Sequence, residues 1–332
     1  MYAPSLAGRV LRLLLESTGP RSGQEMAGKL GVSRAAVGKA VTSLREQGLR
    51  VEARPRLGYQ LQEEPPDPLP VRLEARLRPG SLGLPLYHYA ELDSTNLEAR
   101  RQAEAGAVHG ACFVAESQTA GRGRLGRAWL APPGSSLLFS LLLRPGWPLK
   151  RVFLLNNVIS LAVCRAVENL TGLCPLVKWP NDVFLRGGKL AGVLTEFMGR
   201  SEMAEHVVVG VGLNVNQDED YLASLESPAA SLFSATGQLW DRGLVLAAVL
   251  AQATTLWLQL AEGREDRVLA EYQERSMILG REITVKDGDE LRKGRVEGFT
   301  PEGNMLLVTE RGTLTISHGD VTLAKHDLEK II

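Results

Sequence analysis

A proline-rich segment restricts the architecture of this chain more than any other feature. The segment EEPPDPLP, residues 63–70, contains four prolines in eight residues. Proline fixes φ and lacks a backbone N–H, so this run is incompatible with a helix or an inner strand. We therefore predict a stiff linker that separates a small region, 1–63, from the rest of the chain. The length of 332 residues is sufficient for two or three domains with their own cores.

The region before the linker shows three helical patterns followed by a hairpin pattern. Helices are predicted over about 4–17, 22–31 and 33–48, and Ser22 and Glu25 have the spacing of a capping box. The segment LRVEARPRLGYQL then alternates apolar and polar residues around a proline and a glycine, as a hairpin does. Three helices and a hairpin together predict a winged helix-turn-helix domain.

The charge of this first region indicates its partner. Residues 1–62 carry ten Lys and Arg against four Glu, a net charge of +6, while the whole chain is neutral. A basic helix-turn-helix domain is typical of DNA binding, although small helical domains also bind proteins or form dimers. The candidate DNA contacts lie on the predicted third helix, on the face away from its apolar residues. They are Ser33, Arg34, Lys39, Thr42 and Ser43.

The remaining chain divides into two parts of different texture. Residues 64–275 mix helical and strand patterns, which predicts an α+β domain with a mixed or antiparallel sheet. Residues 276–332 alternate with period two between glycine-containing turns, which predicts a small β-barrel of about five strands.

Cysteine usage and hydropathy indicate the compartment. The three cysteines are scattered without a C-x-x-C spacing, so neither a disulfide framework nor a zinc site is predicted. The apolar stretch near residue 10 is interrupted by charged residues, which argues against a signal peptide and a membrane span. We therefore expect a cytoplasmic protein in a reducing environment.

The loop GRGRLGR, residues 121–127, is the first candidate for binding chemistry. Its spelling matches the dinucleotide fingerprint G-x-G-x-x-G, but prolines follow where the fingerprint needs a helix. The fingerprint also needs an acidic residue about twenty positions later. No Asp or Glu occurs from Ser117 to Val167, which holds seven Lys and Arg instead. Glycines allow close backbone approach and arginines bind phosphate and carboxylate, so the loop predicts an anion clamp. The alternative is an exposed Arg-Gly turn.

Two further segments carry polar residues at the predicted ends of elements. VKWPNDVFLRGGKLAGVLTE, residues 177–196, places Lys178, Asn181 and Asp182 around a proline, with Lys189 after a predicted hairpin. Asn and Asp oxygens suit a magnesium-bound nucleotide, although Pro-Asn-Asp also forms ordinary turns. DSTN, residues 93–96, precedes a predicted helix whose first amides are available to a ligand or are merely capped.

The order of these segments resembles a known family. DSTN, ESQTAGRGRLGR, KWPNDVFLRGGKLAG and GVGLNVN follow one another as in the bifunctional biotin–protein ligases that are also biotin operon repressors. The resemblance covers nearly the whole chain. It implies a winged helix-turn-helix at 1–63, an α+β catalytic domain with a mixed sheet at 64–275 and an SH3-like β-barrel at 276–332.

The resemblance also implies the activity and its partners. Biotin and ATP with Mg²⁺ would give biotinyl-5′-AMP and pyrophosphate, and a lysine of a biotin carboxyl carrier protein would then take the biotin. Biotinyl-5′-AMP would act as intermediate and corepressor. The implied partners are the carrier protein, operator DNA and a second copy of the chain when liganded, without a membrane. Arginines and a lysine suit this reaction because carboxylate and triphosphate repel each other.

Residue roles follow from the resemblance position by position. The implied biotin-binding residues are Ser94, Thr95, Asn96, Gln118, Arg122, Gly123, Arg124 and Lys189. The implied ATP- and adenylate-binding residues are Gly121, Arg124, Arg127, Trp129, Lys178, Asn181, Asn214 and Asn216, with Trp129 packed on the adenine. Lys189, Arg124 and Asp182 are the implied catalytic residues. No metal is expected to be fixed by the protein alone, and Mg²⁺ would come with ATP near Asp182.

One departure and two rival functions complete the sequence-based interpretation. Leu125 stands where another arginine is common in this family, which bears on loop ordering and dimer contacts. A lipoate–protein ligase is the nearest alternative enzyme, and the pair GRGRxG and KWPND argues against it. A ligand-sensing regulator without ligase activity is the other alternative. The joint presence of Arg122, Arg124, Asp182 and Lys189 argues against that function.

Overall fold

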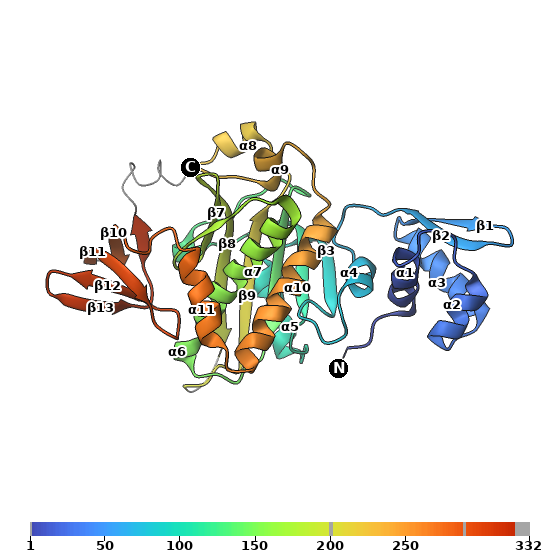
Figure 1. Ribbon diagram of the computed structural model, residues 1–332, viewed down its shortest axis with the longest axis horizontal. Helices are drawn as coiled ribbons and strands as arrows, with labels where there is room; N and C mark the ends of the chain where they lie inside the picture. Colours follow the sequence, from blue (N-terminus) through green and yellow to red (C-terminus); the bar gives the residue numbers. More distant parts are fainter. Residues whose placement is uncertain (1, 199–201, 288–289, 323–332) are drawn as a thin grey trace.

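The protein has an elongated arrangement of three parts. The computed structural model describes residues 2–198, 202–287 and 290–322. Figure 1 shows the helical head at one end, the large mixed sheet with its helices in the middle and the small β domain at the other end. Each part matches the fold that the sequence predicts, and the boundaries between them stay predictions.

The head is a winged helix-turn-helix. Its elements are α1 (Leu6–Leu15), α2 (Gly23–Leu30), α3 (Arg34–Glu46), β1 (Arg50–Arg54) and β2 (Gly58–Glu63). Gly31 adopts the left-handed conformation that ends α2 and turns the chain into α3. The Ser33 hydroxyl accepts from the Ala36 amide and caps α3. The predicted capping box does not form, because Ser22 caps the Gln24 amide and Glu25 forms an ion pair with Lys29.

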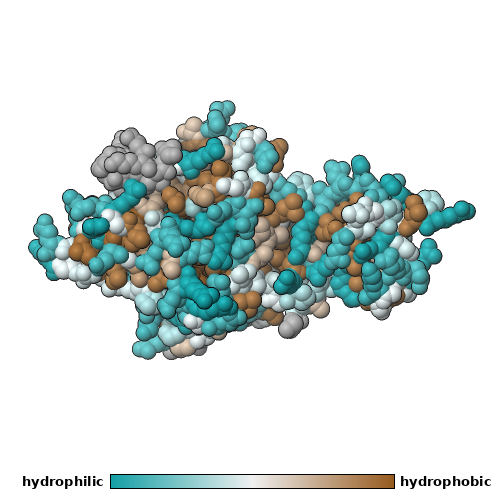
Figure 2. All heavy atoms as spheres, in the orientation of Figure 1, coloured by the Kyte–Doolittle hydropathy of each residue, from teal (hydrophilic) through white to brown (hydrophobic). Residues whose placement is uncertain are grey.

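The head has a core of its own. Val37, Val41 and Leu44 are buried on one face of α3, as their spacing predicts, together with Val10 and Leu11 of α1. Hydrophilic residues predominate on the face of the head that Figure 2 shows.

The linker is docked at both ends. Residues 64–69 form neither helix nor strand, as predicted, but Pro70 opens the short helix α4 (Pro70–Arg76). Val71 and Ala75 of α4 pack into the core of the head, whereas Leu73 packs into the core of the central domain. The expected stiff spacer is therefore a structured connection that shares its helix with both neighbours.

The central domain is built on a seven-stranded mixed sheet. Its strands have the order β3-β4-β5-β9-β8-β7-β6, in which β3 and β4 are parallel and all other neighbours are antiparallel. The strands are β3 (Leu86–Leu92), β4 (Cys112–Gln118), β5 (Ser136–Leu143), β6 (Leu176–Lys178), β7 (Asp182–Leu185), β8 (Gly188–Met198) and β9 (His206–Asn214). The sequence predicted all of these strands except β3.

Helices cover both faces of this sheet. Three helices, α7 (Leu154–Thr171), α10 (Arg242–Ala261) and α11 (Glu265–Glu274), pack on one face, as Figure 1 shows. The helix α5 (Thr95–Glu104) packs on the opposite face through Ala99 and Ala103. The short helices are α6 (Leu149–Val152), α8 (Glu219–Ala223) and α9 (Leu232–Thr236). The stretch from α6 through α7, and α10, are long and apolar enough to cross a membrane, yet both contribute many residues to the buried core.

The third part is a five-stranded antiparallel sheet with the order β13-β12-β11-β10-β14. Its strands are β10 (Glu282–Asp287), β11 (Glu290–Phe299), β12 (Met305–Thr309), β13 (Gly312–Ile316) and β14 (Asp320–Thr322). The hydrogen-bonded pairs among the described residues do not close a ring. The last part of the predicted domain, 323–332, lies outside the described residues. The Trp179 indole N–H donates to the Gly303 carbonyl at 3.0 Å and ties this sheet to the central domain.

Candidate active site

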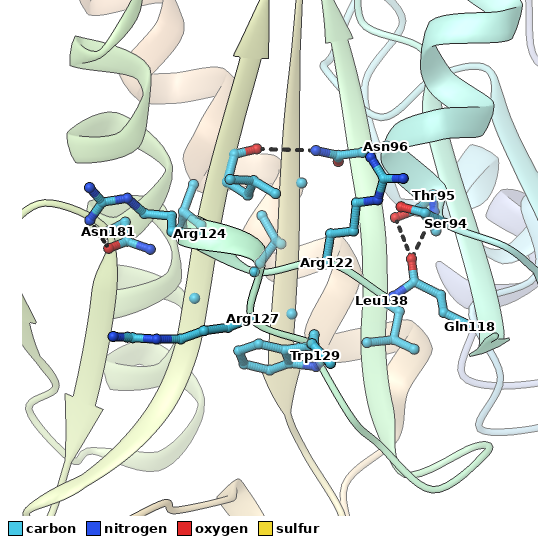
Figure 3. Close-up of a pocket in the computed structure, with 18 of the residues that line it drawn as sticks. Ser94, Thr95, Asn96, Gln118, Arg122, Arg124, Arg127, Trp129, Leu138 and Asn181 are labelled. Carbon is cyan, nitrogen blue, oxygen red and sulfur yellow. Dashed lines mark hydrogen bonds between the residues drawn. The ribbon is translucent and has the colours of Figure 1, made fainter. Parts of the chain in front are cut away.

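A cavity lies on the α5 side of the central sheet, under the loop that the sequence singled out. Figure 3 shows the loop crossing strands of the sheet, with the start of α5 on one side and Asn181 on the other. The cavity has a volume of about 130 Å³. Its lining combines a helix N-terminus, strand residues and the arginines of the loop, so neutral and anionic ligand groups both find partners there.

Trp129 forms one wall of the cavity and lies flat on two glycines. A Cβ atom on Gly212 would lie 2.3 Å from the indole, and one on Gly192 would lie 3.0 Å from it. The Lys189 Nζ stands 5.6 Å from the centre of the indole ring. The indole N–H is buried without a hydrogen-bond partner, although a buried donor normally has one. The cavity thus has an aromatic wall whose buried N–H is unsatisfied.

The segment DSTN is folded against strand β4. Ser94 precedes α5 without a side-chain hydrogen bond to the helix, and the Thr95 amide donates to Gln118 Oε1 at 2.7 Å. Asp93 accepts from the Ser94 amide and from Arg101, and the Arg101 hydrogen bond lowers the pKa of Asp93 to about 2. The structure therefore brings together predicted biotin-binding residues from two segments far apart in sequence.

The loop arginines point in different directions. Figure 3 shows Arg122 directed toward the side of Asn96, and Arg124 toward Asn181. Arg124 donates to Asn181 Oδ1 at 3.1 Å and to the Gly319 carbonyl at 3.2 Å, and its burial lowers its pKa. No pattern in the sequence points to Gly319, because its contact depends on how the third part is placed.

A second contact from the third part holds the same loop. Arg127 forms an ion pair with Asp320, which also lines the cavity. Leu125 adopts a left-handed conformation with φ of 54° and is 74% exposed, so the departure at this position leaves an apolar side chain in solvent.

The KWPND segment supplies the opposite wall. Asn181 and Asp182 both line the cavity, and Asp182 Oδ1 is 2.7 Å from the Nζ atom of Lys189. Lys178 is half-buried over the ring of Phe184, outside the lining, and burial lowers its pKa. The structure thus joins Asp182 to Lys189 and leaves Lys178 behind them.

Two asparagines of GVGLNVN have structural partners. Asn214 donates to the carbonyls of Ala230 and Lys189, at 3.1 Å and 3.3 Å, so it fastens the backbone of Lys189. Asn216 exchanges two hydrogen bonds with the backbone of Trp240, each of 2.9 Å. Asn216 does not line the cavity, and both ends of its side-chain amide are used. The sequence alone does not reveal whether an asparagine side chain binds a ligand or hydrogen-bonds to the protein's own backbone.

The expected DNA-binding residues lie along α3 and at its N-terminal cap. Arg34, Lys39 and Thr42 are exposed, whereas Ser43 is half-buried and accepts from Gln47. The Ser33 hydroxyl caps the helix. The hairpin tip between β1 and β2 adds two exposed arginines that the sequence-based set omitted. They are Arg54 and Arg56.

Comparisons with known proteins agree with this architecture. Residues 92–214 match the model of the Biotin/lipoate A/B protein ligase family. Residues 8–60 match the model of an HTH domain, and residues 278–323 match that of the Biotin protein ligase C terminal domain. The fold and the site thus define a biotin protein ligase that carries a helix-turn-helix head.

Individual relatives narrow the assignment. The Bifunctional ligase/repressor BirA of Bacillus subtilis is 32% identical over 303 residues, 91% of this chain and 93% of the relative. The biotin–[acetyl-CoA-carboxylase] ligase of Mycobacterium tuberculosis is 32% identical over 238 residues, 70% of this chain and 86% of the relative. The structure of the biotin protein ligase from Aquifex aeolicus in complex with biotin and ATP aligns with a TM-score of 0.61 and 33% identity. That alignment covers 72% of this chain and 98% of the other. The chain belongs to the family of bifunctional biotin ligase/repressors.

Proposed function

We propose that this biotin ligase uses the cavity under the 121–127 loop to join biotin to ATP and then transfers biotin to a lysine of a biotin carboxyl carrier protein. The observation that carries the proposal is the convergence of the α5 N-terminus, three loop arginines and Lys189 on one cavity. In the first step the biotin carboxylate attacks the α-phosphorus of ATP and pyrophosphate leaves. Because both reactants are anionic, cationic side chains lower the barrier to their approach.

The residues divide into four roles. The start of α5 and Gln118 hold the biotin head group, while Lys189 and the loop arginines neutralise the carboxylate and the α-phosphate. Trp129 offers its indole face to the adenine and its unpartnered N–H to a ligand acceptor. Asp182 holds the ammonium of Lys189 in place at 2.7 Å.

Magnesium fits the site as an ion brought by ATP. Among residues 2–198, 202–287 and 290–322, no group of three or more His, Cys, Asp or Glu side chains is placed to hold a metal. Asn181 and Asp182 line the cavity, and their side-chain oxygens are of the kind that Mg²⁺ prefers. Bound Mg²⁺ would neutralise phosphate charge, while this chain's own contribution is the placement of Asp182 and Lys189.

The loop has to move during the cycle. A cavity of about 130 Å³ is well below the roughly 300–1,000 Å³ of small-molecule sites. Biotin and ATP therefore enter when residues 121–129 shift outward, and the loop then closes over the adenylate and shields the mixed anhydride from water. In the second step the carrier lysine attacks the acyl carbon and AMP leaves.

Pyrophosphate exchange tests the ligase reaction directly. Purified protein should catalyse biotin-dependent exchange of pyrophosphate into ATP without a carrier, and lipoate should not replace biotin. Exchange at background level with biotin would overturn the proposal. Exchange that depends on lipoate would instead favour a lipoate–protein ligase, the alternative that the family model leaves open.

The head supports a second role. We infer that it binds operator DNA as a homodimer in the liganded state, with biotinyl-5′-AMP as corepressor, because the head is basic and presents Arg34 and Lys39. The exposed arginines of the hairpin tip, Arg54 and Arg56, would add phosphate contacts. We place the protein in the cytoplasm, which is consistent with its three free cysteines.

A further inference from the structure

A chain of hydrogen bonds lies behind the proposed biotin-binding residues of the cavity and ends at a carboxylate. Asn96 Nδ2 donates to Glu196 Oε2 at 2.7 Å, and Ser140 Oγ lies 2.6 Å from Asn96 Oδ1. Ser140 Oγ also lies 2.8 Å from Thr95 Oγ1. Ser140 is fully buried on β5, and Glu196 is half-buried on β8. We call these four residues the Thr95 relay.

The carboxylate gives the relay a direction. An ionised carboxylate only accepts hydrogen bonds, so the amide nitrogen of Asn96 must face Glu196. The Leu194 carbonyl, 3.4 Å from the same nitrogen, imposes the same orientation. The Asn96 oxygen therefore faces Ser140. It packs tightly there, because a Cβ atom on Gly210 would lie 2.1 Å from it.

The number of available hydrogens also fixes which way the hydrogen bond between Ser140 and Thr95 runs. The Ser140 hydroxyl has one hydrogen, and Asn96 Oδ1 has none to give, so the 2.6 Å contact takes the Ser140 hydrogen. The Ser140 oxygen must then accept from the Thr95 hydroxyl across 2.8 Å. Gln118 Oε1 competes for that hydrogen across a longer distance of 3.2 Å, but it already accepts from the Thr95 amide at 2.7 Å, so the shorter contact with Ser140 is favoured. The lone pairs of Thr95 Oγ1 are left for a ligand.

Gln118 is fixed with the opposite polarity. Because its oxygen accepts from the Thr95 amide, its side-chain nitrogen points elsewhere and remains a donor. The nitrogen approaches the loop, since a Cβ atom on Gly121 would lie 3.0 Å from it. An acceptor at Thr95 and a donor at Gln118 match the N–H and C=O groups of a cyclic urea.

We propose that Glu196 and Ser140 are positioning residues that set the hydrogen-bonding polarity of the biotin subsite through Asn96 and Thr95. This inference rests on the proposed function of the cavity and deepens it. Asn96 then contributes to biotin recognition through Thr95, because both ends of its side-chain amide already have protein partners. A dithiolane ring, which has no N–H to donate, leaves the Thr95 acceptor unpaired, so the relay also disfavours lipoate.

Exchanging the charged and neutral partners tests the relay. Asn96→Asp places two carboxylates face to face, and the equilibrium Kd for biotin, measured by titration of the full chain without ATP, should rise roughly tenfold to a hundredfold. Adding Glu196→Gln restores a donor opposite the introduced carboxylate, so the double variant should recover most of the lost affinity. Glu196→Gln alone should have a smaller effect, since its amide oxygen still accepts from Asn96. No recovery in a folded double variant would overturn the relay.

A change of ligand separates positioning from general damage. Two lactam analogues of biotin, each with one ureido N–H replaced by CH₂, report the value of each N–H. The wild type should bind one lactam at least roughly tenfold more weakly than biotin, consistent with one lost buried hydrogen bond. In Ser140→Ala, which introduces no charge, this ratio should shrink toward one while the affinity for the lactam stays similar. An unchanged ratio in Ser140→Ala would contradict the proposal.

Two controls keep this outcome distinct from failure of the proposed function. Glu205→Gln removes an exposed carboxylate from the connection between β8, which carries Glu196, and β9. This variant should leave the biotin Kd and the lactam ratio unchanged. Wild-type protein without biotin-dependent pyrophosphate exchange would refute the ligase assignment of the cavity. The relay alone would be refuted if the wild type is active but two results are negative. These are no recovery of affinity on adding Glu196→Gln to Asn96→Asp, and an unchanged lactam ratio in Ser140→Ala.

Discussion

Lys189 is the residue placed best to bring two anions together. Its ammonium group lies between Asp182 and the Trp129 ring in the cavity. Lys189→Ala should therefore lower biotin-dependent pyrophosphate exchange by about 10²–10³-fold, as removal of a transition-state charge partner does. Lys150→Ala, an exposed lysine on α6, is the control and should keep full exchange. Normal adenylation by Lys189→Ala would show that this charge is not required.

Arg124 is expected also to retain the adenylate after the first step, because it ties the loop to two separate parts of the structure. Its guanidinium donates to Asn181 and to the Gly319 carbonyl. Arg124→Ala should remove about 1.5–3 kcal/mol of charge-assisted hydrogen bonding, so free biotinyl-5′-AMP should escape into solution. Chromatography of the reaction without carrier measures this release. Leu125→Ala, on the same loop and highly exposed, should retain the adenylate.

Asp93, the first residue of the DSTN segment, contributes to the stability of the fold in a pH-dependent way. Its folded pKa of about 2 lies below the ordinary value of 3.8, mainly because Arg101 donates to it. The carboxylate therefore stabilises the fold fully above about pH 4, and this contribution disappears as the pH falls through about 2. The difference in unfolding free energy between wild type and Asp93→Asn should be constant above about pH 4 and shrink toward pH 2. A difference that does not change over that interval would contradict the assigned pKa.

Single residues were predictable where their chemistry is visible in the sequence. Arg124, Asp182 and Lys189 combine charge with flanking glycines or a proline, and the structure brings them to one cavity. Ser140 was not predictable, because a lone serine in an apolar strand carries no signal. Asp320 was not predictable either, since its role depends on how the third part sits against the loop.

At the scale of elements, the sheet supports the site by omitting side chains. Gly212 on β9 lies under Trp129, and an added Cβ would lie 2.3 Å from the indole. Gly212→Ala should displace the ring, raise the KM for ATP and change biotin Kd less, at a stability cost of about 1–3 kcal/mol for overpacking. Gly28→Ala on α2, where an added Cβ meets nothing within 4 Å, is the matched control and should leave both constants unchanged. A normal KM for ATP in Gly212→Ala would contradict the role of the ring.

Elements were predicted well where periodicity is strong. The long apolar helix at 154–171 and the strands from β4 to β9 follow their patterns closely. Among the elements that were missed, β3 and α4 have clear physical reasons. β3 carries a mixed set of polar and aromatic residues at the sheet edge, so its alternation is weak. α4 is short and begins with the last of four prolines, and packing against two cores stabilises it more than its own propensity does.

At the scale of the whole molecule, the head is fastened to the catalytic domain at α4. The buried Arg72 forms ion pairs with Glu64 and Asp241, and the Arg12 guanidinium donates to the Glu74 and Ala75 carbonyls at the end of α4. Deleting residues 1–63 removes Arg12 and exposes the apolar face of α4. The shortened chain should keep pyrophosphate exchange but unfold at a lower temperature, which calorimetry measures. An unchanged unfolding temperature would show that the head adds no stability to the central domain.

The head should bind DNA in a way that depends on the adenylate. A single head has +6 net charge and few exposed base-reading residues on α3, so it should bind weakly and mainly through phosphates. Specific binding needs two heads on a palindromic site whose half-sites are one helical turn or a multiple apart. We expect the adenylate to fix the 121–127 loop and the liganded chains to dimerise and place the heads at that spacing.

Titration at two salt concentrations tests this link between chemistry and regulation. With biotin and ATP present, both the dimer content and the affinity for a site upstream of biotin genes should rise, and random DNA should show no such gain. Because base contacts add to phosphate contacts, affinity for the specific site should exceed that for random DNA at both salt concentrations. Deletion of residues 1–63 should abolish the binding. The regulatory role would be contradicted if affinity for the specific site does not change with the adenylate and falls with salt as steeply as for random DNA. The protein would then be a ligase whose head has lost its regulatory role.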